Sequence, residues 1–148
     1  MKFKLITFKK LKPEQLYDIL QLRSQVFVVE QNCVYQDMDG KDREALHLIG
    51  YAGRDMAAYA RLLKPGVNYK EAAIGRVVVA KNFRGKEYGK EIMKSAIRHC
   101  IIQFKTKVIV VSAQKYLENF YSELGFVTEG KGYLEDGIPH IKMRFTKK

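Results

Sequence analysis

One segment limits the possible folds more than any other, because a strand, a glycine turn and a long helix follow one another directly. Residues 73–80 are rich in valine, which is typical of a strand. From residue 88 to residue 104 the apolar residues recur at three- and four-residue steps, which predicts a helix with one apolar face. Residues 107–113 are again apolar, as expected for a central strand that is covered on both faces. This order predicts a sheet with a helix packed on its face.

The rest of the chain adds strands and helices around that unit. Weak alternation predicts a strand at residues 3–8, and helical spacing predicts a helix from residue 14 to about residue 29. Two strand-like runs, 46–51 and 56–63, are divided by turn residues, and a short helical stripe covers 117–124. Residues 126–130 and 140–145 are predicted to form a last strand pair. The pattern predicts an α/β (α+β) fold with a mixed sheet covered by helices, and 148 residues suit a single domain, 1–148.

The cellular environment is indicated by what the sequence lacks. No apolar run approaches the roughly 18 residues that a membrane helix needs. Lysines at positions 2, 4, 9, 10 and 12 interrupt the only stretch where a signal peptide could begin. We therefore expect a cytoplasmic protein. Cys33 and Cys100 lack the spacing of a metal or redox site, so we expect both to be packed thiols.

Positive charge is concentrated in one part of the chain. There are 27 Lys and Arg residues against 16 Asp and Glu, a formal net charge of +11, which favours an anionic partner. Between Lys81 and Lys107 eight basic residues are opposed only by Glu87 and Glu91, whereas residues 30–44 are locally acidic. On charge alone, the basic run is more typical of a solvated helix face than of a binding site.

The glycine turn before the long helix is the most plausible anion site. The first N–H groups of a helix have no partners within the helix, and the helix dipole adds partial positive charge there. Arg84, Lys86 and Lys90 cluster at this turn together with Gly85 and Gly89, an arrangement that could hold a pyrophosphate. The turn is neither GxGxxG nor GxxxxGK[ST], which disfavours a dinucleotide site and a P-loop.

Two motifs here resemble those of the GNAT acyltransferases. The valine strand and the turn Arg84-Gly85-Lys86-Glu87-Tyr88-Gly89 resemble the family's acetyl-CoA-binding motif, R/Q-x-x-G-x-G/A, with Glu87 in place of the first glycine. Residues 120–126, Phe-Tyr-Ser-Glu-Leu-Gly-Phe, resemble the FYxxxGF signature, and Gln114 occupies a position where many members carry Asn. In the first third, residues 22–23, 26–31 and 47–48 and the loop of Asp37, Asp39 and Asp42 resemble the ElaA-like branch.

The resemblance implies a fold, a cosubstrate and a set of site residues. It implies the GNAT acyl-CoA N-acyltransferase fold, a mixed, mostly antiparallel sheet of about seven strands that is splayed between the fourth and fifth, with helices on both faces. It implies acetyl-CoA as cosubstrate, with Tyr121 protonating the leaving thiolate. Glu30 is expected at the acceptor side of the cleft, where it would bind the amine or deprotonate it. The expected cofactor-binding residues are Val77, Val78, Val79, Arg84, Gly85, Lys86, Glu87, Tyr88, Gly89, Lys90 and Gln114.

We expect no metal site. The acidic run from Asp37 to Asp42 has glycine at position 4 of a calcium loop instead of position 6, and Leu48 at position 12 instead of glutamate. The three histidines are scattered and form no i, i+4 pair for zinc. His99 fits a surface helix position, and His140 has two open interpretations: a solvated or packing residue on a terminal strand, or an active-site residue.

The sequence thus favours an N-acetyltransferase that moves an acetyl group to a primary amine by direct attack in a ternary complex. The alternatives are a basic single-domain nucleic-acid binder and a GNAT fold that binds acyl-CoA without turnover. The binder is disfavoured because the basic helix has an apolar stripe and its charge clusters at a glycine turn. We expect no nucleic acid or membrane partner, and a homodimer is plausible by resemblance. The acceptor (small molecule, polyamine or protein amine) and the general base stay open.

Overall fold

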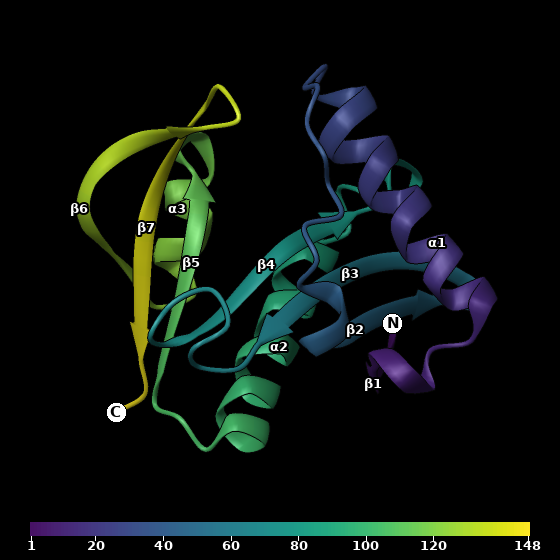
Figure 1. Cartoon of the computed structure of the whole chain (residues 1–148), viewed down its shortest axis with the longest axis horizontal. Coiled ribbons are helices and arrows are strands. Elements are labelled where there is room, and N and C mark those ends of the chain that lie inside the picture. The colour runs from purple at the N-terminus through teal and green to yellow at the C-terminus, as the bar shows by residue number, and fades with distance from the viewer.

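The computed structural model describes residues 1–148 and contains one seven-stranded sheet (Figure 1). Its strands are β1 (Lys2–Thr7), β2 (Leu46–Ala52), β3 (Asp55–Leu63), β4 (Ala72–Val79), β5 (Val108–Gln114), β6 (Phe126–Glu135) and β7 (Ile138–Thr146). They lie in the order β1-β2-β3-β4-β5-β7-β6, and only β4 and β5 run parallel. The expected mixed, mostly antiparallel sheet is confirmed.

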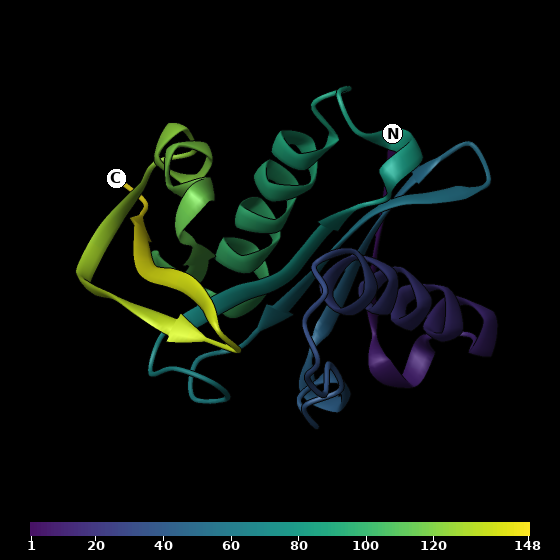
Figure 2. The ribbon, with the colours of Figure 1, turned by 90° about the horizontal axis from the view of Figure 1, so that it is seen from above.

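Three α-helices and several short helical turns surround the sheet. The α-helices are α1 (Pro13–Arg23), α2 (Tyr88–Phe104) and α3 (Glu118–Glu123). The 3-10 turns are η1 (Phe8–Lys10), η3 (Asp42–Glu44), η4 (Lys81–Phe83) and η5 (Lys115–Leu117), and η2 (Ser24–Glu30) is a π-helix. Figure 2 shows α1 and α2 on opposite faces of the β2–β4 half, with α3 beside the other half. No helix has the length and hydropathy needed to cross a membrane.

Side-chain alternation along the strands explains why both faces carry a helix. Ile49 on β2 and Tyr59 on β3 are fully buried and pack with Ile19 of α1. Their neighbours Leu48 and Ala58 point the other way, into the larger cluster that includes the apolar stripe of α2. Because successive strand residues face opposite sides, a central strand that is apolar throughout must be covered twice.

The sheet opens between its two parallel strands. β4 and β5 are paired only at Ala72↔Ile109 and Ala73↔Val110, and beyond these residues the strands diverge (Figure 1). The pairing of β4 with β3 also shifts where Arg76 adopts a φ of 47°, the left-handed region. A bulge of this kind bends a strand and interrupts its ladder. The splay that the resemblance implied is therefore present.

Two expectations about element length are wrong. The helix expected from residue 14 to about 29 ends as an α-helix at Arg23 and continues as the π-helix η2, with i→i+5 bonds such as Cys33 N–H to the Val28 carbonyl. Apolar spacing does not distinguish these two windings over so few residues. The last strands are longer than expected, because β6 and β7 extend to a tight turn at Asp136 and Gly137, both with positive φ.

Candidate active site

The divergence of β4 and β5 creates a cleft of about 710 Å³. One wall comes from the end of η2 and from β4, and the other comes from β5, α3 and the β6–β7 turn. Apolar side chains such as Val77, Val79 and Phe120 line it together with a smaller number of polar groups. A mostly apolar cleft with a few polar groups is typical of a small-molecule site.

The structure brings most of the predicted site residues to this cleft. Nine of them line it: Glu30, Val77, Val78, Val79, Arg84, Gly85, Gly89, Gln114 and Tyr121. Lys86, Glu87, Tyr88 and Lys90 do not. The Lys90 Nζ lies 3.3 Å from Glu123 Oε2 on α3, and the Lys86 Nζ lies 5.6 Å from the centre of the Phe83 ring.

The turn before α2 leaves the start of the helix open. Gly85 has a φ of 81° and Glu87 a φ of 61°, and no side chain caps the first turn of α2. The first N–H groups are therefore free to bind an anion. Glu87, which stands at the position of the expected glycine, adopts the backbone conformation that glycine takes at no steric cost.

Arg84 is held at the end of β4 by two partners. Its Nε donates to the Val79 carbonyl oxygen at 3.2 Å, and its Nη1 and Nη2 donate to the two carboxylate oxygens of Glu30, the latter at 3.2 Å. The hydrogen bond from Arg84 lowers the pKa of the Glu30 carboxyl. A carboxylate held in this way is a weaker base than a free one.

Tyr121 is almost completely enclosed, with 7% of its surface exposed. Its ring makes edge contacts with Phe120 and Phe126, at centroid distances of 5.1 and 5.8 Å. Its hydroxyl takes part in none of the side-chain hydrogen bonds of the protein, although the residue lines the cleft. Burial raises the pKa of Tyr121 to about 12. The phenol is therefore neutral at neutral pH.

This combination of splayed strands, open helix start and cleft tyrosine agrees with the sequence comparison. The family of the acetyltransferase (GNAT) domain matches residues 8–147. The chain belongs to the GNAT acetyltransferase family.

Its relatives lie in the ElaA-like branch of the GNAT family, as the resemblance indicated. The chain is 43% identical over 136 residues to protein ElaA of Escherichia coli K12. The aligned segment covers 90% of this chain and 89% of ElaA. The crystal structure of E. coli ElaA matches with a TM-score of 0.90 at 39% identity, covering 97% of this chain and 98% of that one. An acyl-CoA N-acyltransferase from Pseudomonas aeruginosa matches with a TM-score of 0.91 at 37% identity, covering 99% and 100%.

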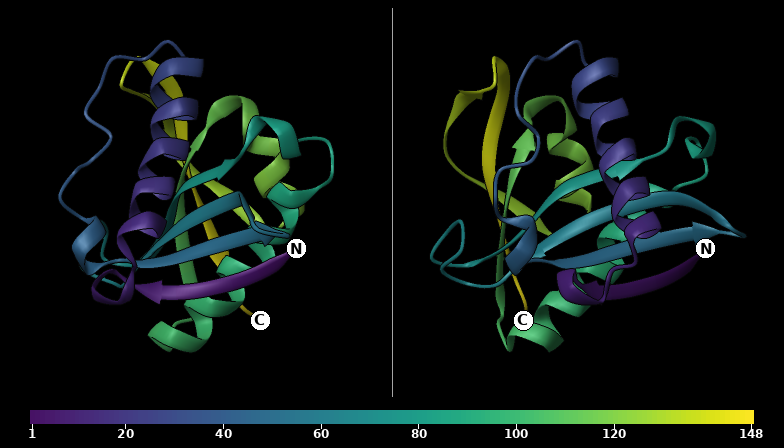
Figure 3. Two further views of the ribbon diagram at one scale, coloured as in Figure 1. Left: turned by 90° about the vertical axis from the view of Figure 1, so that its right-hand side faces the viewer. Right: turned by 45° about the vertical axis from the view of Figure 1, so that its right-hand side comes forward.

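Two polar contacts join the walls of the GNAT cleft on the side away from α2. Gln31 and Gln114 exchange hydrogen bonds at 3.2 and 3.3 Å between their amide groups. The Cys33 Sγ lies 3.3 Å from the Asp136 carbonyl oxygen, so the segment after η2 meets the β6–β7 turn, and Figure 3 shows this segment running between α1 and the β6–β7 hairpin. Cys33 is thus half-buried at the cleft and not in the core, whereas Cys100 is fully buried as expected.

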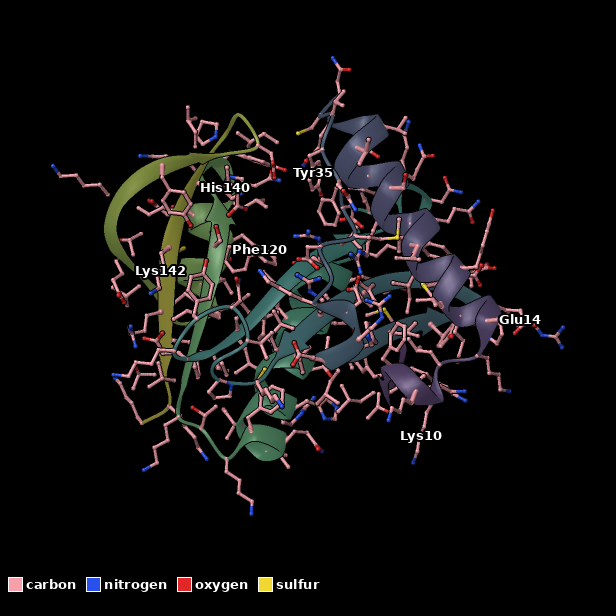
Figure 4. The ribbon with its side chains drawn as sticks, in the orientation of Figure 1. Lys10, Glu14, Tyr35, Phe120, His140 and Lys142 are labelled. Atoms are coloured by element: carbon pink, nitrogen blue, oxygen red, sulfur yellow. The ribbon has the colours of Figure 1, made fainter.

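Several further residues line the acceptor half of the cleft; of these, only His140 had an active-site role among its expected interpretations. Tyr35, Ser112 and Glu135 line the cleft, and so does His140, which is only 6% exposed. Figure 4 shows His140 and Tyr35 on opposite sides of the opening. The Asp136-Gly137 dipeptide between strand-like residues is a hairpin signal that could have placed Glu135 and His140 beside one turn.

The acidic loop is tied to the sheet by three arginines. Arg23, with no exposed surface, binds Asp37 Oδ2 at 2.8 Å and Asp42 Oδ1 at 2.7 Å. Arg61 of β3 binds Asp39 and Asp42, and Arg76 of the β4 bulge binds Asp37 and Asp39. Burial alone would raise the pKa of the Asp42 carboxyl, but hydrogen bonds and charges from Arg23 and Arg61 hold it below its usual range. The loop thereby fixes Tyr35, whose hydroxyl is 3.2 Å from Asp37 Oδ1, at the edge of the cleft.

Proposed function

We propose that this protein transfers the acetyl group of acetyl-CoA to a primary amine by direct attack within a ternary complex. The observation that carries the proposal is one continuous cleft, which connects the uncapped start of α2 to Tyr121. A single elongated ligand with an anionic end and a reactive thioester end would occupy both.

The residues at the α2 end fit a pyrophosphate. Arg84 offers a planar guanidinium, and the N–H groups of the first helical turn have no competing side chain. A Cβ built on Gly85 would meet nothing within 4 Å, so a phosphate has room to approach the backbone. Gly89 and the solvent-exposed Lys86 complete the basic turn. Arg84 would have to share or exchange its contact with Glu30.

The strand edge beyond this turn fits the pantetheine arm. Because β5 leaves β4 after Ala73, no strand pairs with β4 from Val77 to Val79 on that side, where the Val79 carbonyl oxygen accepts from Arg84 Nε. An extended arm can therefore pair with Val77, Val78 and Val79 as a strand would. A β4 N–H directed at the thioester oxygen would stabilise the oxyanion, an effect typically worth about 2.7–4 kcal/mol.

Tyr121 and Glu30 have different proposed roles at the thioester. Tyr121 protonates the departing thiolate, because its buried phenol stays neutral and has no other hydrogen-bond partner. Glu30 is proposed to attract the ammonium form of the acceptor. Its lowered pKa favours that role over proton removal, since a carboxylate that holds its charge strongly accepts a proton weakly.

A test of this function measures binding and turnover separately. Calorimetry with acetyl-CoA should show binding that weakens with added salt, and a panel of amines should release free CoA thiol from the wild-type protein. The Arg84→Ala/Lys86→Ala double variant loses two charge-assisted contacts of about 1.5–3 kcal/mol each and should bind at least tenfold more weakly. Lys94→Ala/Arg98→Ala removes two exposed charges from α2 itself, beyond the turn, and serves as the matched control.

The alternative functions predict different outcomes. A non-catalytic acyl-CoA binder would bind acetyl-CoA without releasing thiol with any amine. A nucleic-acid binder would be stabilised against heat by DNA or RNA and not by acetyl-CoA. Unchanged acetyl-CoA affinity in the Arg84→Ala/Lys86→Ala variant would show that the phosphates of acetyl-CoA do not bind at this turn.

A further inference from the structure

The acceptor half of the cleft contains a buried histidine that the proposed function does not use. His140 lies on β7 opposite Gln114 of β5, and both residues line the cleft. Only 6% of its surface is exposed, and its ring stacks on Tyr133 at an interplanar angle of 19°. Burial and the stacking on Tyr133 therefore restrict the plane of the imidazole.

A backbone contact defines the tautomer of His140. Its Nδ1 lies 2.7 Å from the Ile138 carbonyl oxygen, which can only accept a hydrogen bond. The Nδ1 atom must therefore carry a proton, and in the neutral ring the lone pair is on Nε2. The Nε2 atom is thus the one that can gain and release a proton.

A carboxylate stands beside that atom. Glu135 Oε2 lies 3.4 Å from His140 Nε2, close enough to stabilise the imidazolium that forms when Nε2 accepts a proton. The other oxygen, Glu135 Oε1, lies 3.3 Å from Ser112 Oγ, which is hydrogen-bonded to the Tyr133 hydroxyl. Ser112 and Glu135 line the cleft, whereas Tyr133 lies outside it and is 38% exposed.

We infer that His140 is the general base that removes a proton from the acceptor amine, and that the solvent-exposed carboxylate of Glu135 connects it to solvent. This inference rests on the proposed acetyl transfer. Glu135 is a positioning residue, because it acts on the amine only through the imidazole.

The proton balance of the reaction requires such a path. An ammonium nitrogen that becomes an amide nitrogen loses two protons as the C–N bond forms and the C–S bond breaks. One of them restores the Tyr121 hydroxyl after that phenol has given its proton to the CoA sulfur. The other has no acceptor among the products and must leave the cleft. His140 takes each proton from the nitrogen, and Glu135, whose side chain is 47% exposed, passes the surplus proton to solvent.

The surroundings of His140 are mainly anionic. The charged and titratable groups on the elements packed around it are Glu135 and Tyr133 on β6, Asp136 in the turn, and Lys115 of η5, whose Nζ lies beside Gly132. Cys33 of the opposite wall contacts the Asp136 carbonyl oxygen. Carboxylates on this side attract a cationic amine and favour a protonated imidazole after transfer.

Two variants of His140 distinguish loss of the basic Nε2 atom from a loss of folding. His140→Asn keeps an N–H near the position of Nδ1 for the Ile138 carbonyl and removes Nε2. It should lower turnover at saturating amine by about 10²–10⁴-fold while acetyl-CoA affinity stays within twofold. His140→Ala should regain turnover when imidazole is added, in proportion to the neutral imidazole present. His99→Ala, a histidine outside the cleft, is the control and should retain wild-type turnover.

A second variant tests Glu135 by separating turnover from binding. Glu135→Gln should lower turnover at saturating amine with acetyl-CoA affinity unchanged, because the imidazolium formed in the reaction loses its anionic neighbour. Glu129→Gln alters a carboxylate on the same strand that contacts Arg144 instead and should leave both quantities unchanged.

The possible failures can be told apart. If wild type turns over and His140→Asn does so within threefold of it, or if imidazole gives no rescue of His140→Ala, His140 is not the base. Unchanged turnover at saturating amine in Glu135→Gln would exclude the proposed role of Glu135. If wild type itself releases no CoA with any amine, the proposed function fails, and the base assignment is overturned with it.

Discussion

Arg84 and Glu30 bind each other across the mouth of the cleft, although they come from positions 54 residues apart and were expected to face different substrates. The guanidinium that should bind a phosphate is, in the free protein, held by the carboxylate that should attract an amine. We therefore expect acetyl-CoA binding to release Glu30, because the Arg84 guanidinium cannot form its full set of hydrogen bonds with a phosphate and with the Glu30 carboxylate at the same time.

Glu30→Gln should strengthen acetyl-CoA binding. The exposed ion pair is worth at most about 1 kcal/mol, so the gain in affinity should not exceed about fivefold, measured by calorimetry. Turnover should stay within tenfold of wild type when the amine is saturating. A loss of about 10²–10⁴-fold there would instead identify Glu30 as the base and contradict the assignment to His140.

Glu87→Gly should stabilise the fold. Glu87 has a φ of 61°, and this left-handed conformation costs a non-glycine residue about 1–2 kcal/mol. Glycine avoids that cost, but its greater conformational freedom in the unfolded chain offsets about half of the gain. The free energy of unfolding in urea should rise by about 0.5–1 kcal/mol, and acetyl-CoA should bind more tightly without the nearby negative charge.

Lys105→Gly is the matched control for that variant. Lys105 ends α2 with a φ of 50°, so its replacement should raise stability similarly and leave acetyl-CoA affinity unchanged. Equal affinities in both glycine variants would show that Glu87 does not approach the phosphates.

Tyr121→Phe keeps the ring contacts with Phe120 and Phe126 and removes only the hydroxyl. Turnover should fall by about 10²–10⁴-fold with acetyl-CoA affinity unchanged, since the phenol is proposed to act on the leaving thiolate. Because the pKa of Tyr121 is raised to about 12, wild-type activity should not decline below about pH 10 through loss of this proton. Tyr17→Phe, an exposed tyrosine of α1, is the control; equal turnover in both variants would make Tyr121 a packing residue.

Arg23→Met should strongly destabilise the protein. The variant leaves Asp37 and Asp42 buried without their main cation, a change that typically costs about 3–5 kcal/mol. Urea unfolding at pH 7 should show this loss. A change below 1 kcal/mol would mean that Arg61 and Arg76 hold the loop without Arg23.

The same acidic loop should make the free energy of unfolding decrease at acidic pH. Arg61 and Arg23 lower the pKa values of Asp39 and Asp42 against the opposing effect of burial, so folding favours both carboxylates in the charged form. Their contribution is complete above the unfolded values near pH 4 and is lost as pH falls below them. Asp39→Asn should therefore lose less stability than wild type between pH 5 and pH 3, and an equal loss in both proteins would contradict this origin.

The parts of the fold that could be predicted from the sequence are those that the periodicity of neighbouring residues determines. The change from strand spacing to helical spacing after residue 80 is visible in the chain, and the structure confirms the strand, turn and helix there. The change from α-helix to π-helix after Arg23 is not visible, because it is decided by backbone bonding over one or two turns. The longer β6 and β7 depend on a bulge between Glu129 and Tyr133 that interrupts simple alternation.

The candidate site could be predicted only in part, for a similar reason. Its glycine turn and tyrosine belong to short motifs that resemble a family, and their proposed roles stay predictions. His140 and Glu135 belong to no such motif. His140 by itself fits a surface strand position, and only pairing of β7 with β5 turns it into the cleft.

The sequence by itself determined the order of strands and helices, the open helix start at residues 84–90 and the family to which the chain belongs. Tertiary structure alone decided which distant side chains meet: Arg84 with Glu30, Gln114 with Gln31 and Asp136 with Cys33, pairs that are 54, 83 and 103 residues apart. The physical reason is that periodicity shows which side of an element is apolar and not which other element covers it. Packing of the whole sheet decides which elements cover each other. Here β4 and β5 separate after two residue pairs, so polar side chains that face each other from the two strands line a cleft, where continued pairing would have formed a hydrogen-bonded ladder.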